Sequence, residues 1–102
     1  MEKEITISYE VNNSEVSVLV SYKIELLEDI QTISCMVNPG SFNVPQWLQL
    51  RKFELKSILS GDGDYMPIFT DNENIKNMNA VLFIDKTYND IMRKEQFKMA
   101  VV

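Results

Sequence analysis

The densest group of side chains that could do chemistry is a set of four carboxylates in and after a Gly-Asp-Gly-Asp turn: Asp62, Asp64, Asp71 and Glu73. Oxygen ligands of this kind bind hard cations such as Mg²⁺ and Ca²⁺. A calcium loop also needs ligands at alternate positions and a closing Glu, whereas here residues 65–67 are Tyr, Met and Pro. We therefore expect a solvated turn and no metal, with a divalent-metal carboxylate enzyme as an alternative function.

The chain contains no histidine and a single cysteine, Cys35. Without His, neither a Ser-His-Asp nor a Cys-His nucleophile can be assembled, and no His-ligated metal site can form. One cysteine excludes an intrachain disulfide, and inside an apolar segment it is typical of a small buried side chain. The sequence therefore predicts a protein that is not an enzyme, with no catalytic residue and no cofactor.

The charge favours a protein partner over a nucleic acid. The chain has fifteen acidic and ten basic residues, which gives a net charge of −5. The anionic phosphate backbone of a nucleic acid binds positively charged proteins best. An acidic surface suits a basic protein, because complementary potentials speed encounter and fix orientation. The acids concentrate in residues 1–30 and 61–75. The candidate partner-binding patch is Glu4, Glu10, Glu15, Asp62, Asp64, Asp71 and Glu73.

A second candidate interface is apolar and consists of Leu19, Leu27 and Trp47. The two leucines stand at positions that are otherwise polar in an alternating segment, and Met36 is expected on the same face. Apolar residues on a polar sheet face indicate that a helix of the chain or another subunit covers them. For Trp47 we favour a place in the core, with an exposed interface anchor as the alternative. A self-assembling structural component of a phage or particle, a homo-oligomer, is therefore an alternative function.

Two alternating segments must position much of this surface. Residues 5–11 and 16–26 each alternate apolar and polar side chains, which predicts two strands with one buried face joined at Asn12-Asn13. A two-residue loop would place Glu10 opposite Glu15, a like-charge pair. A four-residue loop avoids that pair, and we therefore favour the wider loop.

Residues 30–37 read as a third strand between a turn at 28–29 and the Asn-Pro-Gly-Ser turn at 38–41. Residues 45–59 are ambiguous. Their Leu, Gln and Lys content and the Pro and Gly at their ends favour a helix. As an alternative, residues 53–59 form a strand that turns through Gly61-Asp62-Gly63 into residues 65–69. Residues 65–70 are short and apolar and are predicted to be a strand in either case. Pro67 would place that last strand at an edge or at a bulge.

The C-terminal third is predicted to contain a loop or one helical turn at 71–79, a short strand at Ala80–Ile84 and a helix capped by Thr87. The apolar face of that helix would carry Tyr88, Ile91, Met92 and Met99. Residues 97–102 could instead form a last strand.

The sequence thus predicts a single globular α+β domain over residues 1–102. Its antiparallel sheet has four to five strands, opens with a three-stranded meander and packs against one or two helices. The acidic opening Met1-Glu2-Lys3-Glu4 is no signal peptide and no apolar stretch spans a membrane, so a cytoplasmic location without membrane contact is expected. We expect a small non-catalytic interaction module: an inhibitor, immunity or accessory protein of bacterial or phage origin that binds a basic protein.

Overall fold

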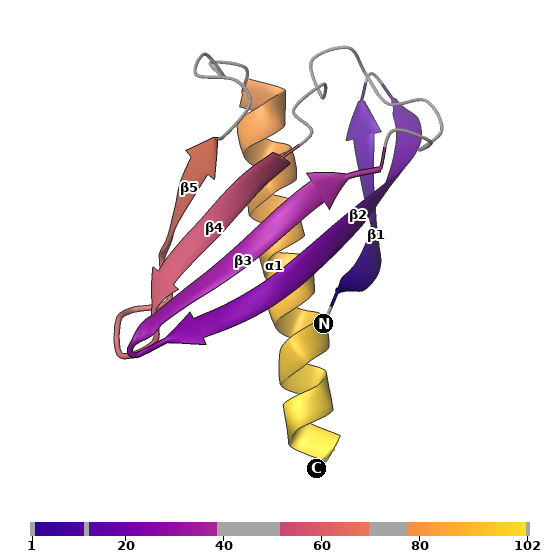
Figure 1. Cartoon of the computed structure of the whole chain (residues 1–102). Coiled ribbons are helices and arrows are strands. Elements are labelled where there is room, and N and C mark those ends of the chain that lie inside the picture. Colours follow the sequence, from indigo (N-terminus) through magenta and orange to yellow (C-terminus); the bar gives the residue numbers. More distant parts are fainter. Residues whose placement is uncertain (1, 12, 39–51, 70–77, 102) are drawn as a thin grey trace.

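The computed structural model describes residues 2–11, 13–38, 52–69 and 78–101, and the statements below refer to these residues. They form five strands and one helix: β1 (Lys3–Val11), β2 (Ser14–Leu27), β3 (Ile30–Val37), β4 (Lys52–Ile58), β5 (Tyr65–Phe69) and α1 (Met78–Val101). The strands lie in the order β1-β2-β3-β4-β5, and each neighbouring pair is antiparallel (Figure 1). The α+β fold and its opening meander are therefore confirmed.

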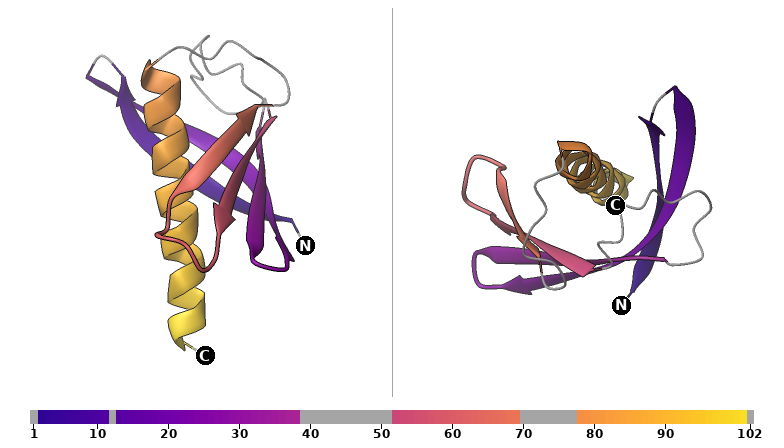
Figure 2. Two further views of the ribbon diagram at one scale, coloured as in Figure 1. Left: turned by 90° about the vertical axis from the view of Figure 1, so that its left-hand side faces the viewer. Right: turned by 90° about the horizontal axis from the view of Figure 1, so that it is seen from above.

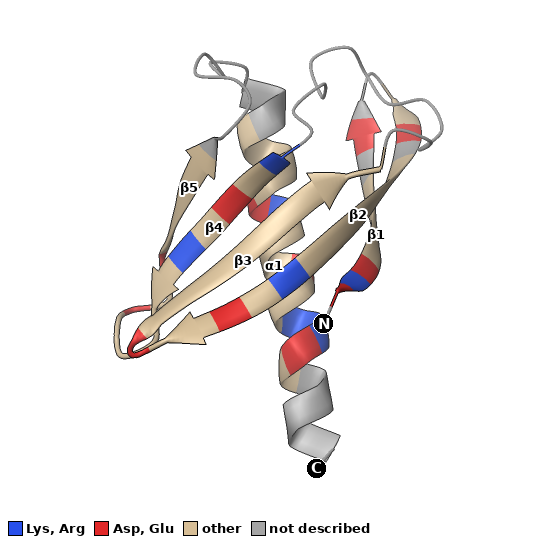
Figure 3. Ribbon diagram, in the orientation of Figure 1, with Lys and Arg blue, Asp and Glu red and all other residues tan. Residues whose placement is uncertain are grey.

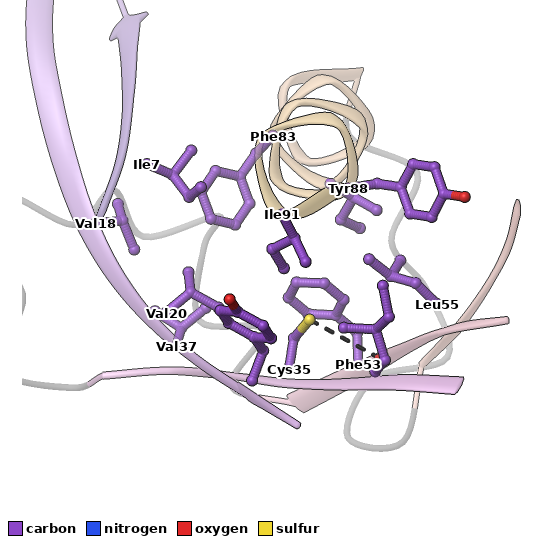
Figure 4. Close-up of a cluster of buried hydrophobic side chains, with 13 residues drawn as sticks. Ile7, Val18, Val20, Cys35, Val37, Phe53, Leu55, Phe83, Tyr88 and Ile91 are labelled. Atoms are coloured by element: carbon purple, nitrogen blue, oxygen red, sulfur yellow. Dashed lines mark hydrogen bonds between the residues drawn. The ribbon is translucent and has the colours of Figure 1, made fainter. Parts of the chain in front are cut away.

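The sheet curls around α1, which lies against its concave face (Figure 2). Alternate residues of the strands point to that side, as the period of two requires. Together with one face of α1 they form a shared core (Figure 4). Its members are Ile7, Val18, Val20, Tyr22, Ile33, Cys35, Val37, Phe53, Leu55, Phe83, Ile84, Tyr88 and Ile91. Strands β1 to β4 and α1 each contribute a fully buried side chain to this cluster.

The register of the first hairpin differs from the one we favoured. Ile7 pairs with Val18 and Glu10 pairs with Glu15, so the strands close through two residues, 12 and 13. Asn13 has a φ of 64°, a left-handed conformation that Asn tolerates well. The tight turn therefore prevails over the mutual repulsion of two exposed carboxylates, which is worth only a few tenths of a kcal/mol.

The helix expected over residues 45–59 is wrong where the structure describes the chain. Residues 52–58 are strand β4, whose side chains alternate between the core and the outer face. The alternative, a hairpin through Gly61-Asp62-Gly63 into β5, is confirmed, and Gly63 adopts a φ of 92° in the turn. Pro67 lies in β5 at the edge of the sheet, as expected. Residues 45–51 lie outside the described residues.

The C-terminal predictions need a larger correction. Residues 80–84 are the first turns of α1 and not a strand, and the helix runs on to Val101, which also excludes a strand at 97–101. Thr87 is buried inside α1 and is no cap: its hydroxyl donates to the carbonyl of Phe83 at 2.8 Å. Tyr88 and Ile91 face the core as predicted. Of the segment 71–79, predicted to be a loop or one helical turn, residues 78 and 79 begin α1, and residues 71–77 lie outside the described residues.

Polar contacts fix α1 to both margins of the sheet. On the β1 side, the Glu95 carboxylate accepts from Lys3 Nζ at 3.0 Å and from the Tyr22 hydroxyl at 2.7 Å. On the β5 side, the Tyr65 and Tyr88 rings stack with centroids 4.3 Å apart. Burial and the neighbouring Glu95 raise the pKa of Tyr22 well above its ordinary value, so this hydroxyl remains a donor. In the described part of the chain, no helix has the length and apolarity to cross a membrane.

Candidate functional site: an apolar corner of the sheet with an acidic rim

The acidic residues singled out from the sequence do not form one patch. Glu10 and Glu15 flank the β1–β2 turn, whereas Asp62 and Asp64 lie in the β4–β5 loop. In an antiparallel meander, these two connections lie at opposite ends of the strands. Figure 3 shows the acidic residues beside the β1–β2 turn far from those in the β4–β5 loop. Glu4 lies near the start of β1. Asp71 and Glu73 lie outside the described residues.

The β4–β5 loop instead meets the β2–β3 turn, which brings two further acids beside it. The carbonyl of Asp29 accepts from the amide of Leu59 at 2.8 Å, and its carboxylate accepts from the amide of Ser60 at 3.1 Å and from the Ser60 hydroxyl. Glu28, next to Asp29, is exposed and has a φ of 56°. The acidic end of the sheet therefore comprises Glu28, Asp29, Asp62 and Asp64.

Four exposed apolar side chains gather on the outer face of the sheet at this same end. The register sets Leu27 opposite Ile30 and Ile30 opposite Ile58, so the three form a row across β2, β3 and β4. Met66 on β5 pairs with Lys56, two residues from Ile58, and extends the row diagonally. Their exposed fractions run from 46% for Ile30 to 75% for Leu27. We call Leu27, Ile30, Ile58 and Met66 the apolar corner.

The surface beside the apolar corner is hollowed rather than flat. A depression of about 360 Å³ lies between β3, β4, β5 and the β4–β5 loop. Ile30, Ile58 and Met66 supply its apolar wall, and Asp62 and Asp64 supply part of its rim. Apolar side chains enclosed by charged ones in this way are typical of protein interfaces, where a dry centre is surrounded by a polar margin.

The apolar interface expected from the sequence is found only in part. Leu27 is exposed and belongs to the apolar corner, whereas Leu19 is half-buried on β2 and lies elsewhere on the outer face. Trp47 lies outside the described residues. Ile30, Ile58 and Met66 were not among the predicted interface residues. For Ile30 and Ile58, alternation with the core residues of β3 and β4 is a signal that they face outward.

The candidate ligands and nucleophiles of the sequence can now be placed in the structure. Among the described residues, no group of three His, Cys, Asp or Glu side chains could hold a metal ion. The Asp62 carboxylate is exposed and accepts from the amide of Asp64 at 3.2 Å, which is the arrangement of an Asx turn. Cys35 lies in the core, where burial raises the pKa of its thiol to about 12, so the thiol is protonated near neutral pH.

Comparisons with known proteins give no further guidance: no protein family, curated protein or solved structure matches the chain.

Proposed function

We propose that the chain is a non-catalytic protein-binding module that docks its partner on the apolar corner. The single observation that carries the proposal is the row of exposed Leu27, Ile30 and Ile58, continued by Met66, beside an acidic rim. Burial of four such side chains against a partner would remove apolar surface from water, at about 25 cal/mol per Å². This gain is available only when a complementary surface covers the corner.

The acidic rim specifies the partner's chemistry. Glu28, Asp62 and Asp64 are exposed around the apolar centre. A partner that presents basic residues around an apolar patch would be steered to this site and oriented on it. In its most concrete form the proposal describes an inhibitor, immunity or accessory protein of bacterial or phage origin that acts in the cytoplasm on a basic protein.

The test is affinity capture from a lysate of the encoding organism, followed by binding measurements with the purified partner. Leu27→Thr, Ile58→Thr and Met66→Thr together remove the apolar centre and retain residues that favour strands. We expect this triple variant to lose the captured partner and the parent complex to weaken with salt. The matched control replaces the exposed apolar pair on α1, Val81→Gln with Leu82→Gln, and should bind like the parent. Unchanged capture by the triple variant would refute the proposal.

A second copy of the chain is the other candidate for covering the apolar corner, which would make the protein self-assembling. Sedimentation velocity over a range of concentrations separates the two functions. If the parent forms a dimer or larger particle and the triple variant is a monomer, self-assembly is favoured. If the parent is a monomer at all concentrations, a foreign partner is favoured.

A further inference from the structure

The two edges of the sheet differ in how well they exclude another strand. β5, at one edge, has five residues with Pro67 at its centre, which has no N–H to donate. β1, at the other edge, has nine residues, contains no proline and pairs residue for residue with β2. A regular edge without a proline or a bulge is a template for a further strand.

One hydrogen bond shows which backbone groups of β1 face away from β2. In an antiparallel pair, alternate residues direct both N–H and C=O to the partner strand, and the residues between direct theirs outward. The carbonyl of Glu4 accepts from Lys94 Nζ of α1 at 2.7 Å, so Glu4 belongs to the outward set. Thr6, Ser8 and Glu10 follow at the same period of two and share it.

A second hydrogen bond supports this assignment independently. Leu19 on β2 lies opposite Thr6, yet its carbonyl accepts from the amide of Asn38, beyond β3, at 2.9 Å. Leu19 therefore directs its carbonyl to the β3 side, and Thr6 directs its backbone groups to the open edge. Lys94 closes this edge only at Glu4. Among the described residues, no strand or side chain bonds the outward backbone groups of Thr6 and Ser8.

The open part of the edge faces a hollow of about 800 Å³ between β1 and α1. Thr6 and Ser8 line it on the side of the sheet, and Lys86, Arg93 and Lys94 line it on the side of the helix. Asp90 also lies in this wall, but it accepts from Lys86 at 3.3 Å and lies 3.9 Å from Arg93. The helix side of the hollow therefore carries three cationic groups and one carboxylate, and its net charge is positive. We call it the cationic wall.

The wall is held in place before any ligand binds. Glu95, one residue beyond Lys94, accepts from Lys3 Nζ and from the Tyr22 hydroxyl. These contacts fix α1 beside β1, and the Lys94 ammonium lies 5.6 Å from the centre of the Tyr22 ring. A site that is formed in advance loses less entropy on binding.

We propose that the open edge of β1 binds an extended acidic segment of a partner protein, which adds a sixth strand to the sheet. The outward N–H and C=O groups of Thr6, Ser8 and Glu10 supply the backbone hydrogen bonds. Alternate side chains of the added strand point to the α1 side, where carboxylates meet Lys86 and Arg93. This site lies at the opposite edge from β5 and does not depend on the apolar corner.

Charge argues against a second copy of the chain as the occupant. A two-fold pairing of β1 with β1 centred on Ile7 sets Glu4 of one copy opposite Glu10 of the other. Such a pairing also brings the two cationic walls towards each other. Like charges placed opposite one another destabilise strand pairing, whereas an acidic strand neutralises the wall.

Fluorescence anisotropy with a labelled peptide of alternating Glu and Val tests the proposal. We expect saturable binding that weakens with salt and is about tenfold weaker for the same peptide with Lys in place of Glu. Methylation of the peptide amides that face β1 should also weaken binding about tenfold, because it removes backbone donors. Equal binding of the methylated peptide, or no saturable binding, would overturn the proposal.

Variants of the chain test the same site from the other side. Thr6→Pro removes an outward N–H that the ladder with β2 does not use, and Thr6→Ala is its control. Arg93→Glu inverts a cation that is 82% exposed, and Lys56→Glu on the outer face makes the same change of net charge elsewhere. We expect Thr6→Pro and Arg93→Glu each to weaken binding about tenfold and the controls to bind like the parent. An equal loss of peptide affinity in the control variants would refute an acidic foreign strand as the occupant. A parent protein that is a dimer and becomes a monomer on Thr6→Pro would refute it as well.

Discussion

At the scale of single residues, Cys35 shows how position in the sheet decides chemistry. Its side chain points into the core, where it is 3% exposed, as expected for a lone cysteine in an apolar strand. Burial raises the pKa of the thiol from an ordinary value of 9.0 to about 12. The unfolded chain therefore loses this proton at a lower pH than the folded chain, and rising pH favours unfolding between those two values.

This difference predicts an alkaline loss of stability that depends on Cys35. The free energy of unfolding should fall by about 1 kcal/mol from this group between about pH 8 and about pH 10. Urea midpoints measured across that range should fall less for Cys35→Ala, although its stability at neutral pH is lower because of the smaller side chain. Tyr65, whose pKa burial and Asp85 raise to about 12, titrates in both proteins and cancels in the comparison. An equal fall in parent and variant would contradict the assignment.

At the scale of elements, strict alternation made β1 and β2 predictable, and β3 was predictable from its β-branched and apolar residues between two turns. β4 carries the same signal, with Phe53, Leu55 and Ser57 buried in alternation. Helix-favouring Leu and Lys residues obscured it, because helix propensity is a weak preference that pairing with β3 and β5 overrides. The Gly-Asp-Gly turn was the stronger local signal, since it fixes where the chain reverses.

The start of α1 was not predictable by the same means. Residues 80–84 form a short apolar run, and periodicity alone does not distinguish a strand from a helix over so few residues. The structure resolves the ambiguity: Phe83 and Ile84 are buried, whereas Val81 and Leu82 are exposed. Adjacent buried positions follow from a helical period and not from an alternating one. Thr87 then lies on the core side, and its hydroxyl is satisfied within the helix.

The register of the first hairpin leads to a prediction about Glu10 and Glu15, which pair across the strands and are both exposed. Glu10→Lys should replace repulsion with attraction and raise the free energy of unfolding by about 0.5 kcal/mol. Thermal unfolding followed by circular dichroism measures the gain. Glu15→Lys should give the same gain, and the double variant should lose it, because two lysines then repel each other. A double variant that gains as much as the single ones would point to net charge instead of this pair.

At the scale of the whole molecule, the candidate site is less predictable than the fold. The sequence shows which residues are acidic, but the meander separates Glu10 and Glu15 from Asp62 and Asp64 and brings Glu28 and Asp29 to the latter. The apolar corner likewise comes from four strands. Its members are distant in sequence, so only the register brings them together. The open edge of β1 depends on strand order, which alternation within one strand does not give.

A single core under one helix also sets how the molecule unfolds. Ile91 is fully buried where α1 meets the sheet, whereas Leu82 on the same helix is 60% exposed. Ile91→Ala should lower the free energy of unfolding by about 2–4 kcal/mol, because it removes buried methylene groups and leaves a cavity. The melting temperature should fall by more than about 10 °C, and the helical signal and the near-ultraviolet tyrosine signal should be lost together. Leu82→Ala should shift the transition far less. If the helical signal of Ile91→Ala melted before the tyrosine signal, α1 would be a separate unit and not the cover on which the sheet depends.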